Sequence, residues 1–147
     1  FEAIYQGTPE APGLRRTERL TVSREMILAL ASRRPLAVVT GRPRTDAERF
    51  LHEQGIADCF AAVVTMEDGP LKPDPAPVQL ALERLGVATA WMIGDTPDAL
   101  RAARGAGVLP IGVVAPGDRP GATTASLRRA GATVVLAAIS EILEVLP

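Results

Sequence analysis

The chain has 147 residues, a length typical of a single domain. Its net charge of −1 provides no overall positive field to attract nucleic acid or an anionic membrane, and no apolar run approaches the ~20 residues that span a bilayer. Cys59 is the only cysteine and His52 the only histidine, which argues against a disulfide framework, a histidine-rich metal site and a Ser-His-Asp triad. We therefore expect a cytoplasmic protein without nucleic-acid or membrane partners.

Helical and strand patterns alternate along most of the chain. Residues 1–21 are the exception, and we expect them to be irregular because glycines and prolines interrupt every period. Ser23 is a suitable N-cap for the first helix, and Gly86 a suitable end for the third. The predicted elements, in chain order, are helix 24–33, strand 36–40, helix 44–54, strand 62–65, helix 78–85, strand 91–93, helix 97–106, strands 110–114 and 133–136, and helix 139–146.

The strands are short and continuously apolar, which is typical of a parallel sheet covered by helices on both faces. With right-handed crossovers, the pattern predicts an α/β fold with an open, doubly wound sheet. Ligands bind such sheets at the carboxyl ends of the strands. Three segments follow strands there: Thr40-Gly41-Arg42, residues 65–68, and Gly94-Asp95-Thr96-Pro97-Asp98. Lys72 lies in the loop after the second of these segments.

Lys72 is the only lysine, whereas the other 15 of the 16 basic residues are arginine. A lysine retained in such a composition indicates a role that arginine cannot fill. An ammonium is a compact point charge, and a guanidinium is a wide planar fork, so a tight site for a phosphate oxygen and a carboxylate would distinguish them. The alternative is that Lys72 is a chance of composition.

The predicted sheet edge carries groups that suit a phosphoryl ligand. Thr40 offers a hydroxyl, Gly41 an accessible backbone N–H, and Lys72 a positive charge, while Asp95 and Asp98 offer carboxylates for a hard cation such as Mg²⁺. Each motif also has a structural interpretation, as a turn or as a helix start with proline near N1. Their order on successive strand ends favours the functional interpretation.

Three of these segments together resemble the motifs of the haloacid dehalogenase-like (HAD) hydrolase superfamily. Residues 38–41 (Val-Val-Thr-Gly) are similar to its second motif, residues 71–75 (Leu-Lys-Pro-Asp-Pro) to its third, and residues 92–98 (Met-Ile-Gly-Asp-Thr-Pro-Asp) to its fourth. The resemblance covers about residues 23–147. Residues 40–43 (Thr-Gly-Arg-Pro) and 106–108 (Ala-Gly-Val) further resemble the phosphoglycolate phosphatase-like subfamily.

The resemblance implies an Mg²⁺-dependent phosphatase acting on a small phosphorylated metabolite. Thr40 would bind the phosphoryl oxygen. Lys72 would orient the nucleophile and stabilise the transition state. Asp95 would be a direct Mg²⁺ ligand, with Asp98 beside it. Arg42 is a candidate contact for phosphate or substrate, and a solvated loop arginine is an equally open interpretation.

Two departures from the family pattern stand out. No Asp-x-Asp follows an apolar strand, although the family's first motif supplies the nucleophile and the general acid/base from that sequence. Ala99 occupies the position, four residues after Asp95, where the family usually has an acid. The outer support of the metal is therefore one carboxylate short.

The missing strand of the family lies at the centre of the sheet, between strands 36–40 and 90–94. Its removal leaves buried N–H and C=O groups unpaired at ~1–3 kcal/mol each. We therefore expect the chain to be the C-terminal part of a longer protein, whose upstream segment supplies this strand and most of the cap. Residues 1–22 would be the end of the cap and its linker, and residues 23–147 the core.

Two other functions remain open at this point. The absent nucleophile and Ala99 favour a non-catalytic HAD-like scaffold or regulatory domain, which the retained Thr40, Lys72 and Asp95 oppose. A phosphomutase or dehalogenase of the same fold is the other alternative.

Overall fold

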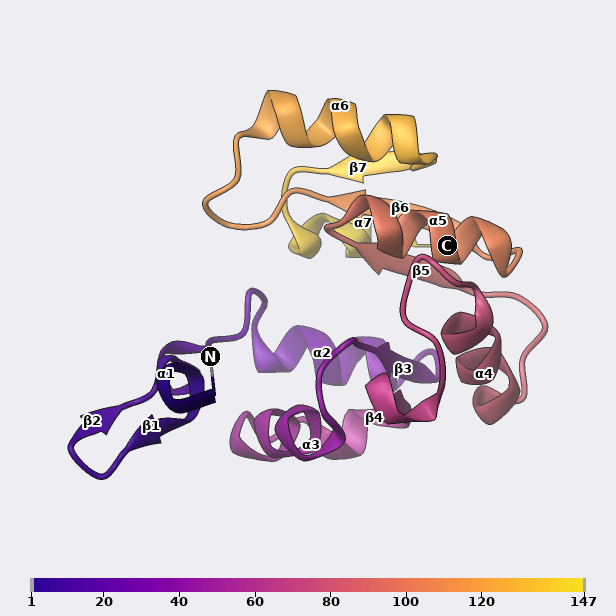
Figure 1. The fold of residues 1–147 in the computed structure, drawn as a ribbon. Coiled ribbons are helices and arrows are strands. Elements are labelled where there is room, and N and C mark those ends of the chain that lie inside the picture. The colour runs from indigo at the N-terminus through magenta and orange to yellow at the C-terminus, as the bar shows by residue number, and fades with distance from the viewer. Residues whose placement is uncertain (1, 147) are drawn as a thin grey trace.

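The structure is a computed structural model that describes residues 2–146, so Phe1 and Pro147, the outer ends of the predicted domain ranges, lie outside it. Figure 1 shows helices covering short strands. The elements in chain order are α1 (Glu2–Gln6), β1 (Gly7–Thr8), β2 (Ala11–Pro12), η1 (Leu14–Thr17), α2 (Arg24–Ala31), β3 (Leu36–Val39), α3 (Arg44–Glu53), η2 (Ala57–Cys59), β4 (Phe60–Val64), η3 (Met66–Asp68), α4 (Ala76–Leu85), β5 (Trp91–Gly94), α5 (Pro97–Gly105), β6 (Leu109–Val113), α6 (Pro120–Ala130), β7 (Val134–Leu136), η4 (Ile139–Glu141) and α7 (Ile142–Val145).

The predicted alternation of helices and parallel strands is confirmed from α2 onward. Local chemistry explains several boundaries. The Ser23 hydroxyl accepts the Met26 N–H at 3.2 Å and starts α2, and the Thr96 hydroxyl accepts the Ala99 N–H at 3.3 Å and starts α5. Gly86 ends α4 in the left-handed conformation, at φ 66°.

The prediction that residues 1–21 are irregular is wrong. They form α1, a hairpin in which β1 pairs antiparallel with β2, and the short helix η1. Glycine explains the difference, because Gly7 has a positive φ of 88° and a Cβ on Gly13 would lie 2.2 Å from the Tyr5 carbonyl oxygen. The glycines that interrupt the sequence period thus allow the hairpin to return close to α1.

The strands form two separate parallel sheets instead of one. β3 pairs with β4, while β5, β6 and β7 form a three-stranded sheet in that order. In Figure 1 the first sheet lies in the lower half of the molecule and the second in the upper half. β3 and β5 therefore each keep an edge without a strand partner in the described chain. These are the two strands between which the sequence places a missing central strand.

Helices join the two sheets. On one side, Val78 of α4 and Ala102 and Ala103 of α5 form a buried cluster that also packs against Val39 and Met92, one from each sheet. Elsewhere, α2 contributes residues to a cluster with the β3–β4 sheet and to another with β6, β7 and α7. Side-chain packing thus holds together two sheets that share no backbone ladder. No helix in the described part of the chain is both long enough and apolar enough to cross a membrane.

Candidate functional site

The loop after β3 and the loop after β4 meet at one small cavity of about 250 Å³. Thr40 directly follows β3, and its N–H donates to the Val64 carbonyl at 2.9 Å while its hydroxyl accepts the Arg42 N–H at 3.2 Å. The cavity brings together four of the six predicted site residues, namely Thr40, Gly41, Lys72 and Asp98. Its other lining residues are Val39, Thr65, Pro70, Leu71, Pro77 and Thr96.

Lys72 reaches the open edge of β3. Its Nζ donates to the Val39 carbonyl oxygen at 3.0 Å. Neighbouring residues of a strand direct their backbone groups to opposite sides. Because the Thr40 N–H bonds to β4, the Val39 carbonyl points away from β4, toward the edge that lacks a partner strand. Burial lowers the pKa of Lys72, and the charge of Asp95 opposes that shift. The ammonium therefore lies at the open edge of β3, where it interacts electrostatically with Asp95, the residue that follows β5.

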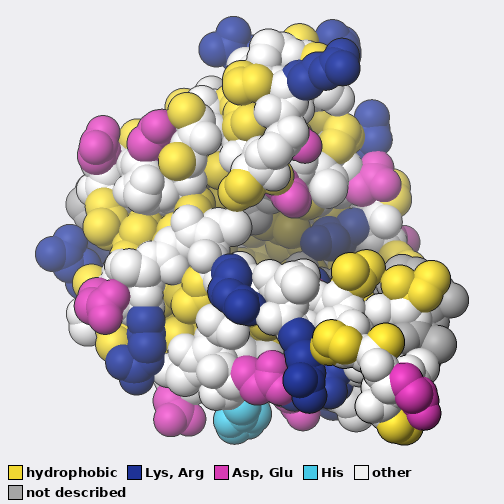
Figure 2. All heavy atoms as spheres, turned by 90° about the vertical axis from the view of Figure 1, so that its left-hand side faces the viewer, with side chains coloured by type: hydrophobic (Ala, Val, Ile, Leu, Met, Phe, Trp, Pro, Cys, Tyr) yellow, Lys and Arg dark blue, Asp and Glu magenta, His cyan; other side chains and the backbone are white. Residues whose placement is uncertain are grey.

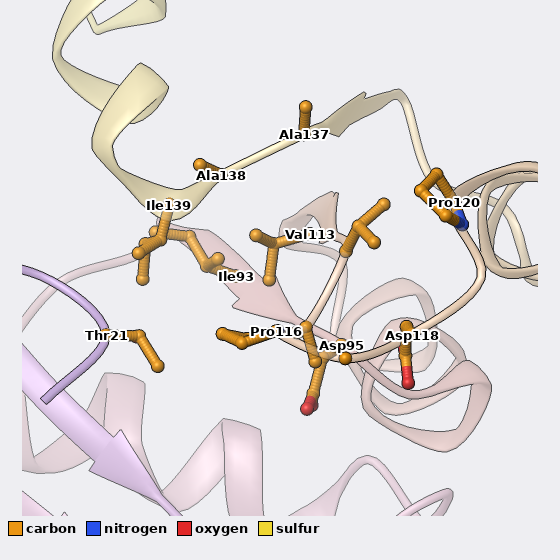
Figure 3. A pocket seen from close by; sticks show the side chains of 14 residues that line it. Thr21, Ile93, Asp95, Val113, Pro116, Asp118, Pro120, Ala137, Ala138 and Ile139 are labelled. Carbon is orange, nitrogen blue, oxygen red and sulfur yellow. The ribbon is translucent and has the colours of Figure 1, made fainter. Parts of the chain in front are cut away.

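Asp95 borders a second, larger cavity of about 510 Å³ at the carboxyl ends of β5, β6 and β7. Ile93, Val113 and Ile139 supply apolar walls. In Figure 3 the carboxyl groups of Asp95 and Asp118 point to the same side, away from the segment that follows β7. The Gly94–Asp98 segment thus separates the two cavities. Figure 2 shows the surface hollowed between the upper and lower halves, with apolar side chains in the hollow.

The two predicted metal ligands have different surroundings. Asp98 is about half exposed, and its Oδ1 accepts Arg101 at 2.8 Å. Asp95 is exposed at the rim of the larger cavity. Nowhere in residues 2–146 do three His, Cys, Asp or Glu side chains gather as a metal site. Mg²⁺ is commonly held by one or two carboxylates, with water and phosphate oxygens completing its shell, so Asp95 fits as one ligand of a site that needs further donors.

Ala99 is a packing residue in this chain. It is 3% exposed, and a Cβ built on Gly94 would lie 2.6 Å from the Ala99 Cβ. The side chain at this position therefore points into the contact between α5 and β5. A carboxylate at this position would be buried in that contact.

The turn from Thr65 to Asp68 forms a dense polar network. Asp68 accepts hydrogen bonds from the Thr65 N–H at 2.8 Å, the Thr65 hydroxyl at 3.0 Å, the Arg84 guanidinium at 2.7 Å, and Arg44. Hydrogen bonds from the Thr65 backbone and Arg84 hold the pKa of Asp68 well below its usual range. The sequence analysis placed residues 65–68 at the carboxyl-end edge of the sheet but did not predict this hydrogen-bond network. The signal was the Thr-x-x-Asp spacing of a capping box.

Arg42 is engaged by the N-terminal segment. Its guanidinium donates to both Glu18 carboxylate oxygens, at 2.6 and 3.1 Å, and lies 5.8 Å from the centre of the Phe50 ring. The Tyr5 hydroxyl also donates to Glu18 at 3.1 Å. Arg42 thus joins residues 5–18 to the loop after β3, and it does not line the cavity that contains Thr40 and Lys72.

Comparisons with known proteins establish the family of the chain. The family described as haloacid dehalogenase-like hydrolase matches residues 15–113, about two thirds of the chain. The chain belongs to this HAD-like family. A Phytophthora nicotianae protein named imidazoleglycerol-phosphate dehydratase is 41% identical to this chain. That match covers the whole of this chain and 35% of the Phytophthora protein. A Neisseria meningitidis phosphoglycolate phosphatase is 39% identical over a match that covers 54% of this chain and 35% of the Neisseria protein.

Solved structures of HAD proteins share the fold. A HAD-superfamily hydrolase of subfamily IA from Geobacter sulfurreducens superposes with a TM-score of 0.67 and 25% identity, covering 84% of this chain and 58% of that one. The chain thus spans about a third of the curated relatives' length and just over half of that structure. The predicted family and fold are confirmed.

Proposed function

We propose that this chain is the C-terminal part of a HAD-type phosphatase that hydrolyses a small phosphorylated metabolite. The observation that carries the proposal is the meeting of Thr40, Gly41 and Lys72 in one small cavity at the strand ends. A hydroxyl, a backbone N–H and an ammonium are the donors that a phosphoryl group requires. Membership of the HAD-like family supports the same chemistry.

The nucleophile would come from an upstream strand inserted between β3 and β5. Both strands have open edges facing that position, and one apolar parallel strand could pair with both. Its end would bring an Asp-x-Asp sequence beside Lys72. The first carboxylate would attack phosphorus as the ester P–O bond breaks, and the second would protonate the leaving oxygen. Water would then hydrolyse the aspartyl-phosphate and release inorganic phosphate.

Each predicted site residue would have a defined part in this reaction. The Thr40 hydroxyl and the Gly41 N–H would hold phosphoryl oxygens. The Lys72 ammonium would fix the attacking carboxylate and stabilise charge in the transition state. Asp95 would hold Mg²⁺, with Asp98, in the first turn of α5, as the second carboxylate. Bound Mg²⁺ would neutralise negative charge on the phosphoryl oxygens. Arg42 would contact substrate only after exchanging its bonds with Glu18.

The proposed domain organisation follows from the same strand. Residues 1–22 would be the end of a cap and its linker, and residues 23–147 the core. The full-length match to part of the Phytophthora nicotianae protein supports a unit that occurs within longer polypeptides. The names of the relatives suggest which compounds to test first: the phosphate esters phosphoglycolate and imidazoleglycerol phosphate, and the phosphoanhydride pyrophosphate.

A non-catalytic scaffold is the second candidate. The observation that favours it is Ala99, because the family's usual acid is replaced by a residue that packs against Gly94. A scaffold would keep the fold and lose turnover.

One experiment separates the two functions. Residues 1–147 alone, and the same residues preceded by the coding sequence upstream of them, are assayed for phosphate release with and without Mg²⁺. We expect turnover only in the longer protein with Mg²⁺, and its loss in Lys72→Met. A longer protein that lacks an Asp-x-Asp strand, or that releases no phosphate from any of the three compounds, would establish the scaffold instead.

A further inference from the structure

The carboxylate of Asp68 holds three parts of the chain together. Its Oδ2 accepts the Thr65 N–H, the Thr65 hydroxyl and the Arg44 guanidinium, and its Oδ1 accepts the Arg84 guanidinium at 2.7 Å. The side chain is only 11% exposed. Four donors, two of them charged, therefore converge on one nearly buried group. Such charge-assisted bonds are about twice as strong as neutral ones.

The three parts are those that carry the proposed phosphoryl site. Arg44 begins α3 directly after the loop of Thr40 and Gly41. Thr65 directly follows β4 and lines the same cavity as Lys72. Arg84 belongs to α4, the helix that follows the Lys72 loop. Asp68 thus bonds to three segments: α3, which follows the Thr40 loop; Thr65, which follows β4; and α4, which follows the Lys72 loop.

Glu67 and Met66 add to this connection. The Glu67 carboxylate accepts the Arg44 backbone N–H, at 3.1 Å from each oxygen, and lies 2.8 Å from the Thr65 hydroxyl, whose single proton it shares with Asp68. The Met66 N–H donates to the Arg42 carbonyl at 3.2 Å. The turn therefore bonds to the chain on both sides of Pro43, and it fixes the loop after β3 against the loop after β4.

We propose that Asp68 is a positioning residue that sets the Thr40 loop and the Lys72 ammonium at the spacing a phosphoryl group needs. The inference rests on the proposed phosphatase function. Asp68 does not line the cavity and acts only through its partners. Without its charge, Arg44 and Arg84 lose a common anchor and the two loops separate. A displacement of about 1 Å in such a site can reduce turnover by ~10²-fold.

The chain offers a matched control in Asp46. This carboxylate is 6% exposed, and it accepts Gln6 at 2.9 Å and Arg49 at 2.7 Å. Its bonds hold the N-terminal segment and stay within α3, so none of them joins the two site loops. Asp68→Asn and Asp46→Asn therefore each remove one carboxylate charge from its partners, and only the first disturbs the proposed spacing.

The test compares both variants in the protein that includes the upstream strand. We expect Asp68→Asn to lower kcat by about 10–100-fold and to weaken binding of inorganic phosphate, measured by calorimetry, while Asp46→Asn changes both by less than about threefold. In a Lys72→Met background, Asp68→Asn should lower kcat by less than about threefold, because the spacing that Asp68 sets, between the Thr40 loop and the Lys72 ammonium, no longer matters once the ammonium is removed. If Asp68→Asn folds poorly, Arg84→Gln, which removes a more exposed partner, should give a smaller loss in the same direction.

Two results would overturn the inference in distinguishable ways. If Asp68→Asn and Asp46→Asn lower kcat and phosphate affinity equally, or if the loss persists in full beside Lys72→Met, Asp68 is a structural residue only. If the unsubstituted protein neither hydrolyses the three compounds nor binds inorganic phosphate, the proposed function itself fails, and this inference fails with it.

Discussion

The two sides of the candidate site, one after β3 and β4 and the other after β5, differ in how many hydrogen bonds and ion pairs hold their polar side chains in place. On the β3–β4 side, Thr65, Glu67 and Asp68 bond to one another and to Arg44 and Arg84. On the β5 side, Asp95 and Asp98 are exposed, and the ion pair at Asp98 is with an exposed arginine of its own helix. The first side is preorganised by its own residues. The second side offers carboxylates that still need partners, which under our proposal are a cation and the end of an upstream strand.

The largest expected effect lies where the two sides meet, at Lys72. Its ammonium bonds to the β3 edge and is in the field of Asp95. In the protein with its upstream strand, Lys72→Met should lower kcat by ~10²–10³-fold, as for loss of a transition-state donor. Lys72→Arg should fail as well, because a planar fork does not fit a point-charge site. Near-normal kcat in Lys72→Arg would show that the single lysine is a chance of composition.

The next effect concerns Ala99 on the β5 side. Ala99→Asp would bury a carboxylate against Gly94, so we expect the free energy of unfolding without Mg²⁺ to fall by ~1–3 kcal/mol. Mg²⁺ should recover part of this loss if the new carboxylate supports the metal. Chemical denaturation with Mg²⁺ and with EDTA measures both. Equal losses under the two conditions would remove this position from the metal site.

A smaller effect compares equivalent caps on α2 and α5. Thr96→Ala and Ser23→Ala each remove an N-cap hydroxyl, so each should lower the free energy of unfolding by ~1 kcal/mol. Only Thr96 belongs to the segment that carries Asp95 and Asp98. Thr96→Ala should therefore also raise the Mg²⁺ concentration needed for half-maximal activity, whereas Ser23→Ala should not. A titration that gives the same Mg²⁺ dependence for both variants would contradict a metal role for this segment.

The smallest effect is confined to acid pH and tests the preorganised side. The pKa of Asp68 is lowered in the folded state, so the unfolded chain binds more protons as the pH falls. The stability that Asp68 contributes is complete above its unfolded pKa of about 3.9 and is lost as the pH falls below it. The difference in unfolding free energy between the unsubstituted protein and Asp68→Asn should therefore shrink below about pH 4. A constant difference from pH 7 to pH 3 would show that Asp68 is not ionised in these bonds.

The sequence determined the features that depend on neighbouring residues. Strand and helix periods, the Ser23 cap and the Gly86 end are encoded within a few positions, and so is the order in which Thr40, Lys72 and Asp95 follow their strands. The open edges of β3 and β5 were also predictable, because the family resemblance placed a strand there that the chain lacks. The sequence did not reveal the hairpin before α2, since it depends on how closely Gly13 approaches the Tyr5 carbonyl.

Only the tertiary structure decided which side chains share a site. Arg42 and Arg44 are each 24 residues from their partners, Glu18 and Asp68, and nothing local to either pair reveals the contact. The burial of Ala99 likewise follows from the packing of α5 on β5 and not from its neighbours in the sequence. The physical reason is common to these cases. Helix and strand formation follows from local hydrogen bonding and apolar spacing, whereas ion pairs and burial depend on how distant elements pack against each other.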